Sequence, residues 1–265
     1  MGSGAVGGYF GARLAAAHND VAFIARGDHL AAMRSRGLEV ASPLGNLHLD
    51  PVRAVATPAE AIGADVVLFT VKMSDTLSAA EAIRPLMRDG VIIVTLQNGV
   101  ESADQILSVL PGADVVPGVA RIAARIEAPG RITHSGAFAR IEMGERGGRR
   151  SPPVAAFHAA CRAADIDAVL VDDIVRALWL KFAMQAPAAG LTTLTREPIG
   201  PVRSAPGTRR LLEAAVAEVV EVSMALGTGL LAGDTAAVLK AIDGLPAAMS
   251  SSMALDQARG KPLEL

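Results

Sequence analysis

The sequence predicts an α/β protein, with an N-terminal Rossmann-type doubly wound parallel sheet over residues 1–171 and an all-helical domain over 172–265. Two observations predict this fold. In the first half, short runs rich in Val and Ile alternate with helical segments, which is typical of a parallel sheet with helices on both faces. After residue 171 only helical patterns remain, so strands first and helices afterwards indicate two domains.

Three runs of the first half have the composition of buried strands, namely 21–25 (VAFIA), 65–71 (DVVLFTV) and 91–96 (VIIVTL). Helices are expected between and after them, over 8–17, from Asp28 onward, over 74–87 and over 101–109. The stretch 36–54 contains SPLGN and indicates a loop or hairpin inserted into this alternation. Alternating residues over 121–145 then predict two antiparallel strands, joined by a turn at Ala-Pro-Gly.

The remaining chain is expected to form a helix over 154–164, a short strand over 168–171 and four further helices. These helices are expected over 173–189, 207–226, 234–242 and 246–258. The segment 177–195 is apolar but carries Lys181, Gln185 and Pro187, which favours a buried helix over a membrane span. A lysine on such a helix is conspicuous.

Composition excludes several classes of partner. The net charge is only −2, from 25 basic and 27 acidic residues that are mixed along the chain, so we expect neither nucleic acid nor a membrane as partner. Cys161 is the single cysteine and the five histidines are scattered, which leaves no disulfide framework and no metal site. The N-terminus lacks the features of a signal peptide, and a cytoplasmic location is expected.

The N-terminus, MGSGAVGGYFGARLA, contains a candidate phosphate-binding loop. Gly2, Gly4 and Gly7 match the pattern G-x-G-x-x-G, with Ala5 and Val6 between the last two glycines. Such glycines allow a tight turn and a close approach of the backbone to a pyrophosphate, which also meets the N–H groups of the following helix. A merely flexible, glycine-rich start is the alternative.

Arg26 lies 19 residues after Gly7, where the strand over 21–25 ends. This is the place at which a dinucleotide-binding domain meets the adenosine ribose. A carboxylate there would accept a hydrogen bond from the 2′-hydroxyl of NAD, whereas an arginine suits the 2′-phosphate of NADP. We therefore expect NADP, with a solvated loop arginine as the alternative.

Two other expected strands end in polar residues, at Lys72 and at Asn98. In open α/β sheets ligands bind outside the carboxyl ends of the strands, so both side chains are expected to face the same crevice as the glycine loop. Each also has an ordinary explanation, because lysines often close strands in solvent and Asn-Gly is a common turn.

The motifs together resemble the ketopantoate reductases (2-dehydropantoate 2-reductases). The resemblance rests on GSGAVGGYFGARLA, the arginine after the second strand, VTVK, LQNGV, LWLKF and the terminal SSM and KPLE, in this order along nearly the whole chain. It implies a Rossmann domain, a helical domain and an active site in the cleft between them. It also implies reduction of a 2-keto acid by NADPH, as in pantothenate biosynthesis, and leaves a homodimer possible.

The resemblance also implies roles for individual residues. Lys181 matches the catalytic lysine of the family and Glu264 matches the glutamate of its terminal motif. Ser252, Asn98 and Gln185 fall at substrate-binding positions, while Lys72 and Asn98 fall beside the cofactor. For Ser252 a helix cap is the alternative, and for Lys181 a side chain that merely extends to solvent.

General chemistry also supports a role for Lys181 and Glu264 in reduction of a ketone. A hydride that arrives at a ketone carbon leaves negative charge on the oxygen, and a preorganised cation or acid must meet that charge. Lys181 could donate a hydrogen bond to the carbonyl and then a proton to the alkoxide. Burial would favour its neutral form, while Glu264 nearby would favour the ammonium.

The sequence departs from the family in the lysine helix and at both ends. The best-known members carry asparagines four and eight residues after the lysine, on the same helix face, where this chain has Gln185 and Ala189. Reduction of another small 2-keto acid is therefore an alternative. A non-catalytic NADP-binding sensor is a further alternative, because the fold alone does not imply catalysis. Only Met1 precedes the glycine loop and the chain stops just after Glu264, so we expect a missing first strand, an unanchored loop and a shortened C-terminus.

Overall fold

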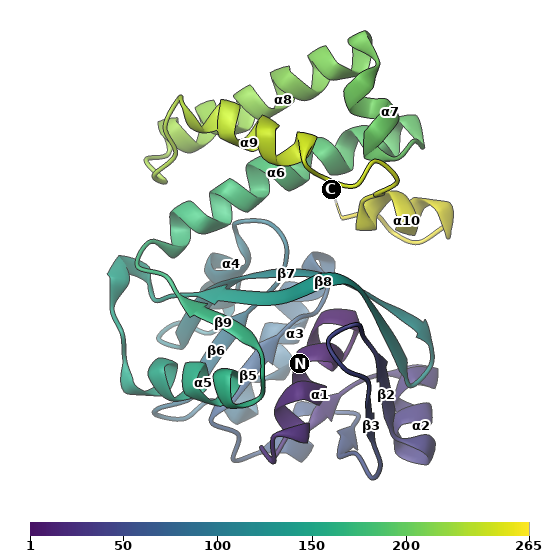
Figure 1. The fold of residues 1–265 in the computed structure, drawn as a ribbon. Coiled ribbons are helices and arrows are strands. Elements are labelled where there is room, and N and C mark those ends of the chain that lie inside the picture. Colours follow the sequence, from purple (N-terminus) through teal and green to yellow (C-terminus); the bar gives the residue numbers. More distant parts are fainter. Residues whose placement is uncertain (265) are drawn as a thin grey trace. The chain divides into compact units, whose positions relative to one another are not determined.

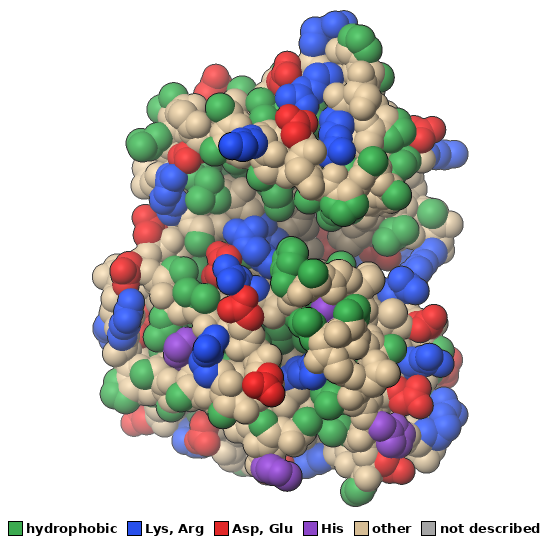
Figure 2. Space-filling view, in the orientation of Figure 1, with side chains coloured by type: hydrophobic (Ala, Val, Ile, Leu, Met, Phe, Trp, Pro, Cys, Tyr) green, Lys and Arg blue, Asp and Glu red, His purple; other side chains and the backbone are tan. Residues whose placement is uncertain are grey.

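The computed structural model describes residues 1–264. The chain divides into two compact units, Met1–Ile174 and a second that begins at Val175. Figure 1 shows strands and helices in the first and helices in the second. Basic and acidic side chains are interspersed over the face drawn in Figure 2. In the described chain no helix is both long and apolar enough to cross a membrane.

The N-terminal unit is built on parallel strands. β5 (Val66–Phe69), β6 (Ile92–Thr95) and the start of β7 (Asp114–Ala128) pair in parallel and in register. β1 (Phe23–Ile24) pairs with β4 (Ala54–Val55), also in parallel. These positions agree with the three strand-like runs of the sequence, although each strand is shorter than its apolar run.

Helices cover both faces of this sheet, and β6 shows why its sequence is apolar throughout. Ile92 and Val94 pack with α1 (Ala5–Ala16), α2 (Gly27–Arg36) and α5 (Pro152–Ala163). Ile93, between them, packs on the other face with α3 (Thr76–Ala82) and α4 (Ser102–Val109). Because neighbouring residues of a strand point to opposite faces, a strand covered on both sides has no polar alternation.

The expected antiparallel pair is a long hairpin. β7 continues past its parallel segment and turns back as β8 (Arg131–Met143), which pairs with it from Ala128 to Gly118. β9 (Asp167–Leu170) and β2 (Leu38–Ala41) join β8 in parallel, and β3 (Leu47–Leu49) pairs with β2 as an antiparallel hairpin. The segment 36–54 is therefore part of the sheet.

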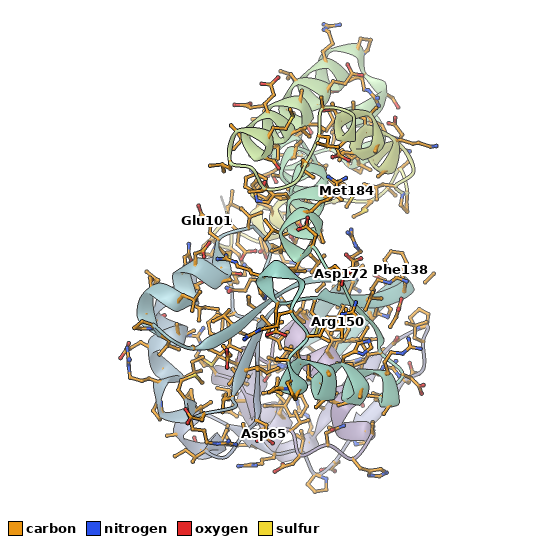
Figure 3. The ribbon with its side chains drawn as sticks, turned by 90° about the vertical axis from the view of Figure 1, so that its left-hand side faces the viewer. Asp65, Glu101, Phe138, Arg150, Asp172 and Met184 are labelled. Carbon is orange, nitrogen blue, oxygen red and sulfur yellow. The ribbon has the colours of Figure 1, made fainter. Side chains whose placement is uncertain are left out.

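Beyond β9 the chain approaches the second unit through a short polar turn. Arg150 donates a hydrogen bond to the Asp172 carboxylate at 2.9 Å, and Figure 3 labels both side chains beside this turn. This exposed ion pair joins the loop that precedes α5 to the one that follows β9.

Met1 to Ser3 lie between β1 and β5. Met1 N donates to Leu68 O at 2.7 Å and Thr70 N donates to Met1 O at 2.9 Å, which is the bonding pattern of parallel strands. Ser3 N donates to Ile24 O at 3.0 Å on the other side. These bonds join the β1–β4 pair to the larger sheet, so the expectation of an unanchored glycine loop is wrong.

The second unit consists of helices in its described part, which are α6 (Ile174–Thr195), α7 (Ile199–Ser204), α8 (Pro206–Ala225), α9 (Asp234–Asp243) and α10 (Ser252–Ala258). α6 runs on to Thr195 rather than ending at 189, and it includes Pro187. α7 was not expected from the sequence. The expected helix over 246–258 is wrong in its first part, because the chain becomes helical only at Ser252.

The helix 74–87 of the sequence prediction is also wrong as one element. It is divided into a 3-10 turn η2 (Met73–Asp75), α3 and a 3-10 turn η3 (Arg84–Leu86). Pro85 explains the end of α3, because proline disfavours helical backbone at the residue before it and offers no N–H.

One ion pair joins two helices inside the second unit. Arg176, at the start of α6, donates two hydrogen bonds to the Asp234 carboxylate at 2.8 and 2.9 Å. Leu231 N donates to the same carboxylate at 2.7 Å. The Arg176 hydrogen bonds and then that of Leu231 lower the pKa of Asp234 below its ordinary value. The carboxylate thus fastens the beginning of α9 to α6.

We expect Asp234→Asn to destabilise the protein at pH 7 by about 1–3 kcal/mol, because charged hydrogen bonds in a mostly buried pair are lost. A carboxyl whose pKa is depressed in the folded state stabilises it above the unfolded pKa of about 3.9, and that stabilisation is lost as the pH falls through the folded value. The difference in the free energy of unfolding between wild type and variant, measured by urea denaturation, should therefore be constant from pH 6 to 8 and shrink below about pH 4. A difference that does not vary with pH would contradict this assignment.

Candidate active site

The glycine loop leads from Met1 into α1, whose N-terminal cap is Gly4. Within the described chain no side chain caps this helix end. The first N–H groups of a helix have no partner inside it, so those of Ala5, Val6 and Gly7 are suited to meet an anion. Thr70 follows β5 directly and holds the loop in place, because its hydroxyl donates a hydrogen bond to Gly2 O at 2.7 Å and lies 3.1 Å from Met1 O.

The three glycines of the fingerprint each have a distinct environment. Gly2 has φ +87°, the left-handed region in which glycine is favoured. A Cβ on Gly7 would collide with the Thr70 hydroxyl, so this glycine allows α1 to pack against β5. A Cβ on Gly4, by contrast, would meet nothing closer than 4.0 Å, which leaves its outer side open for a phosphate. The loop therefore fits a dinucleotide pyrophosphate in the way the fingerprint requires.

The strand ends carry the expected polar residues at one edge of the sheet. Arg26 follows β1 and is the N-cap of α2, Lys72 follows β5, and Asn98 follows β6. Because β5 and β6 are parallel and Met1–Ser3 connect β5 to β1, these positions lie at the same edge as the glycine loop. Arg26 reaches further along this edge, where it pairs with Asp75 at 2.7 Å.

Sequence reasoning missed Gln97, which precedes Asn98 and is only 5% exposed. Its amide donates to Val71 O at 3.0 Å and to the Thr76 hydroxyl at 2.9 Å, so it ties the end of β6 to the end of β5. The Thr95 hydroxyl donates to the side-chain Oε1 of Gln97 at 3.3 Å. The sequence signal that could have identified Gln97 is a polar residue directly after an apolar strand. Gln97 positions the turns that carry Lys72 and Asn98.

In the helical unit Lys181 and Gln185 lie one turn apart on α6, and both are partly buried. The rings of Trp179 and Phe182 beside them pack edge to face, with centroids 5.7 Å apart. Ala189, one turn further, is 9% exposed. The chain thus keeps an amide one turn after the lysine and an apolar, buried side chain two turns after it.

Ser251, rather than Ser252, caps α10. Its hydroxyl accepts from Ala254 N at 3.0 Å and from the Thr192 hydroxyl of α6 at 2.9 Å. The capping alternative raised for Ser252 therefore belongs to its neighbour, and Ser252 is exposed at the first position of the helix. Glu264 lies six residues beyond α10 and makes contacts of its own. Thr192 and Ser251 fix the start of α10 to the helix that carries Lys181.

One buried histidine and the single cysteine have structural roles. His134 is 2% exposed on β8, where its ring lies 2.9 Å from the Ser42 hydroxyl and 3.2 Å from Phe138 O. Cys161 is fully buried in α5, and this burial raises the pKa of its thiol to about 12. Among the described residues no cluster of three or more His, Cys, Asp or Glu could hold a metal ion.

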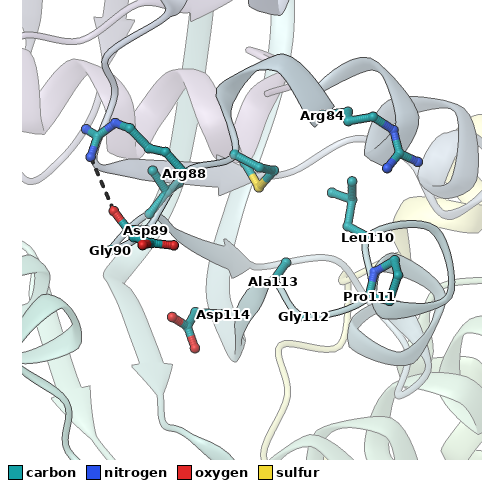
Figure 4. Close-up of a pocket in the computed structure, with 11 residues that line it drawn as sticks. Arg84, Arg88, Asp89, Gly90, Leu110, Pro111, Gly112, Ala113 and Asp114 are labelled. Carbon is teal, nitrogen blue, oxygen red and sulfur yellow. Dashed lines mark hydrogen bonds between the residues drawn. The ribbon is translucent and has the colours of Figure 1, made fainter.

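A hollow of about 580 Å³ lies at the opposite edge of the sheet, at the amino ends of β6 and β7 (Figure 4). Its two arginines are already engaged, Arg84 by Glu81 and Arg88 by Asp65. Ligands of open α/β sheets bind outside the carboxyl ends of the strands, so this hollow is on the wrong edge for the cofactor.

A parallel sheet covered on both faces, a glycine loop that fits a pyrophosphate and a separate helical unit define a dinucleotide-dependent oxidoreductase. Comparison with known proteins specifies the class. The family Ketopantoate reductase PanE/ApbA matches residues 1–148, and its C-terminal counterpart matches residues 173–265. The chain belongs to the ketopantoate reductase family, whose members use a nicotinamide cofactor.

Individual relatives agree with this membership. The 2-dehydropantoate 2-reductase of Mesorhizobium japonicum is 30% identical over 286 aligned positions, which cover 100% of this chain and 86% of that protein. The crystal structure of 2-dehydropantoate 2-reductase from Geobacter metallireducens has 32% identity and a TM-score of 0.91, and the match covers 100% of this chain and 87% of that one. D-mandelate dehydrogenase in complex with NADH and anilino(oxo)acetate has the same fold at 19% identity, with a TM-score of 0.88 and coverage of 99% and 86%.

The contact between Gly7 and Thr70 can be tested directly. Gly7→Ala should weaken binding of NADPH and NADH at least about 10-fold, because the methyl group forces α1 away from β5 and displaces the N–H groups of the loop. Gly207→Ala is a matched control, since a Cβ there meets nothing within 4 Å. Affinities measured by isothermal titration calorimetry decide the matter, and equal affinities for the two variants would contradict the loop assignment.

Proposed function

We propose that the protein reduces ketopantoate to pantoate with NADPH. The family membership of both halves of the chain, together with the open side of Gly4 and the close packing of Gly7, is the observation that carries this proposal. Gly2, Gly4, Ala5, Val6 and Gly7 would hold the pyrophosphate, with Lys72 and Asn98 beside the cofactor.

NADPH is preferred in this proposal because of the residue that follows β1. The side chain of Arg26 is 83% exposed. Its guanidinium group can bind a 2′-phosphate through two charge-assisted hydrogen bonds. A carboxylate, which would accept from the 2′-hydroxyl of NADH, does not occupy the corresponding position.

Lys181 is the proposed acid. The bound cofactor supplies a hydride to the keto carbon, and the reaction is completed by a proton at the oxygen. Lys181 donates a hydrogen bond to the carbonyl oxygen, stabilises the charge that develops there and then gives up its proton. Glu264 holds the lysine or the substrate hydroxyl in place, while Asn98, Ser252 and Gln185 bind the substrate's polar groups.

A different small 2-keto acid is the second candidate substrate. Gln185 and Ala189 stand where the best-known family members carry asparagines, and Ala189 is buried and apolar. A site that lacks one hydrogen-bonding partner discriminates differently between close substrates. The fold is shared with D-mandelate dehydrogenase, whose complex contains NADH and anilino(oxo)acetate, so an aromatic 2-keto acid belongs among those to be tried.

We expect the protein to oxidise NADPH in the presence of ketopantoate, which can be measured by the loss of NADPH absorbance. Among a panel of 2-keto acids, ketopantoate should give the highest kcat/KM. A panel of ketopantoate, benzoylformate, 2-oxoisovalerate and pyruvate covers polar, aromatic and small aliphatic side chains. Turnover of another acid alone would replace the substrate and leave the chemistry in place. Tight NADPH binding without turnover of any acid would indicate a sensor and refute the proposal.

Lys181→Ala should lower kcat by about 10²- to 10⁴-fold, which is the usual contribution of a positioned general acid. NADPH affinity should stay unchanged, since the cofactor loop lies in the other unit. Lys240→Ala, which removes a lysine from the last turn of α9, is the control and should leave kcat as in wild type. If both variants keep full kcat, another group protonates the product.

A further inference from the structure

The carboxylate of Asp75 faces the arginine that the proposed function assigns to the 2′-phosphate. Arg26 Nη2 donates to Asp75 Oδ2 at 2.7 Å, across 49 residues of sequence. Asp75 ends η2 and is the N-cap of α3, yet its side chain caps no N–H of that helix. Among residues 1–264, the carboxylate accepts one further bond besides that of Arg26, a long one from the Ser74 hydroxyl at 3.4 Å.

Arg26 and Asp75 follow the two strands, β1 and β5, between which Met1–Ser3 lie. Arg26 comes two residues after β1, to which Ser3 is bonded, and Asp75 comes six residues after β5, to which Met1 is bonded. Asp75 N donates to Lys72 O at 2.9 Å, so the turn that begins at Lys72 fixes the backbone that carries the carboxylate. The ion pair therefore lies at the edge of the sheet where the adenosine ribose is expected.

Charge and exposure determine what this pair can do. The Arg26 side chain is 83% exposed and that of Asp75 38%, and ion pairs this exposed contribute little stability. A 2′-phosphate can therefore displace the carboxylate from Arg26. The carboxylate then remains beside a dianion, which is unfavourable, whereas a ribose 2′-hydroxyl can donate a hydrogen bond to it.

Two other charged residues lie close to the pair in the sequence. Lys72 is three residues before Asp75 and exposed, and it is a second cation that a phosphate can meet. Asp28 is two residues after Arg26, in the first turn of α2, and is exposed. The edge thus carries two cations and two carboxylates, but only Asp75 is bonded to Arg26 among the described residues.

We propose that Asp75 determines the cofactor selectivity of this protein: by holding Arg26, it reduces the preference for a 2′-phosphate so that NADH is accepted as well as NADPH. The inference rests on the proposed function, because it assumes that Arg26 meets the adenosine ribose. It concerns a residue to which neither the motifs nor the family membership assigns a role.

The test measures affinities by calorimetry rather than turnover. Asp75→Asn should raise the ratio of the NADH to the NADPH dissociation constant by about 3- to 30-fold, because the repelling carboxylate is removed and Arg26 is released. The ratio of the AMP to the adenosine 2′,5′-bisphosphate dissociation constant should change by the same factor, since those two fragments differ only in the 2′-phosphate. The effect should shrink at 1 M salt, where charges are screened within about 3 Å.

Asp65→Asn is the matched control. Asp65 forms an ion pair of the same 2.7 Å length with Arg88, and it precedes β5 at the opposite edge of the sheet. The ratio of the NADH to the NADPH dissociation constant of Asp65→Asn should equal that of wild type. Asp75→Glu keeps a carboxylate and should also stay near wild type, which separates the effect of charge from a disturbance of the turn.

The outcomes distinguish this inference from the proposed function. If Asp75→Asn and Asp65→Asn have equal ratios of the NADH to the NADPH dissociation constant, and NADPH is still bound tightly, the role of Asp75 is overturned and the proposed function stands. Failure of the wild type to bind either dinucleotide would refute the proposed function as well. A ratio that changes equally in Asp75→Asn and Asp75→Glu would indicate that the turn, and not the charge, is responsible.

Discussion

The packing of α1 against the end of β5 is the constraint on which the rest of the N-terminal unit depends. The Thr70 hydroxyl occupies the place that a side chain at position 7 would need, and it also bonds to the carbonyls of Met1 and Gly2. One side chain thus sets both the distance between helix and sheet and the course of the loop. The backbone N–H groups at the start of α1 are fixed in consequence, before any ligand arrives.

A second level of organisation is the way neighbouring strand ends are tied together. Gln97 bonds to the backbone at Val71 and to Thr76, and Arg26 bonds to Asp75. The first connection is buried and the second is exposed, so they differ in strength: a buried polar network is costly to break, whereas a surface ion pair opens readily. The end of β6 is therefore rigid relative to β5, while the arginine is able to exchange partners.

Much of the N-terminal unit could be predicted because its physical signals are local. Continuous apolar runs marked β5 and β6, the glycine fingerprint marked the turn into α1, and alternation marked β7 and β8. The segment 74–87 has a helical pattern along its whole length, and the interruption comes from the single residue Pro85. α7 has no clear helical signal, because Gly200 and Pro201 weaken it. Partners such as Asp75 for Arg26 lie 49 residues apart, and no local pattern connects them.

The candidate site was predicted unevenly for the same reason. Arg26, Lys72 and Asn98 follow recognisable strands, the glycine loop has its own fingerprint, and all of them lie at one edge of the sheet. The residues that hold them, Thr70 and Gln97, were not singled out, because their roles depend on contacts across the sheet. Ser251 was not distinguished from Ser252, since only the position at which α10 begins decides which hydroxyl becomes the cap.

Burial of Cys161 has a practical consequence for work on this protein. It is the only cysteine of the chain, it is fully enclosed in α5, and its thiol pKa of about 12 leaves almost no thiolate at neutral pH. A cysteine introduced on the surface would therefore be the one position that maleimides and iodoacetamides label in the native state. Fluorescent or spin probes can therefore be attached to either unit without first removing the natural cysteine.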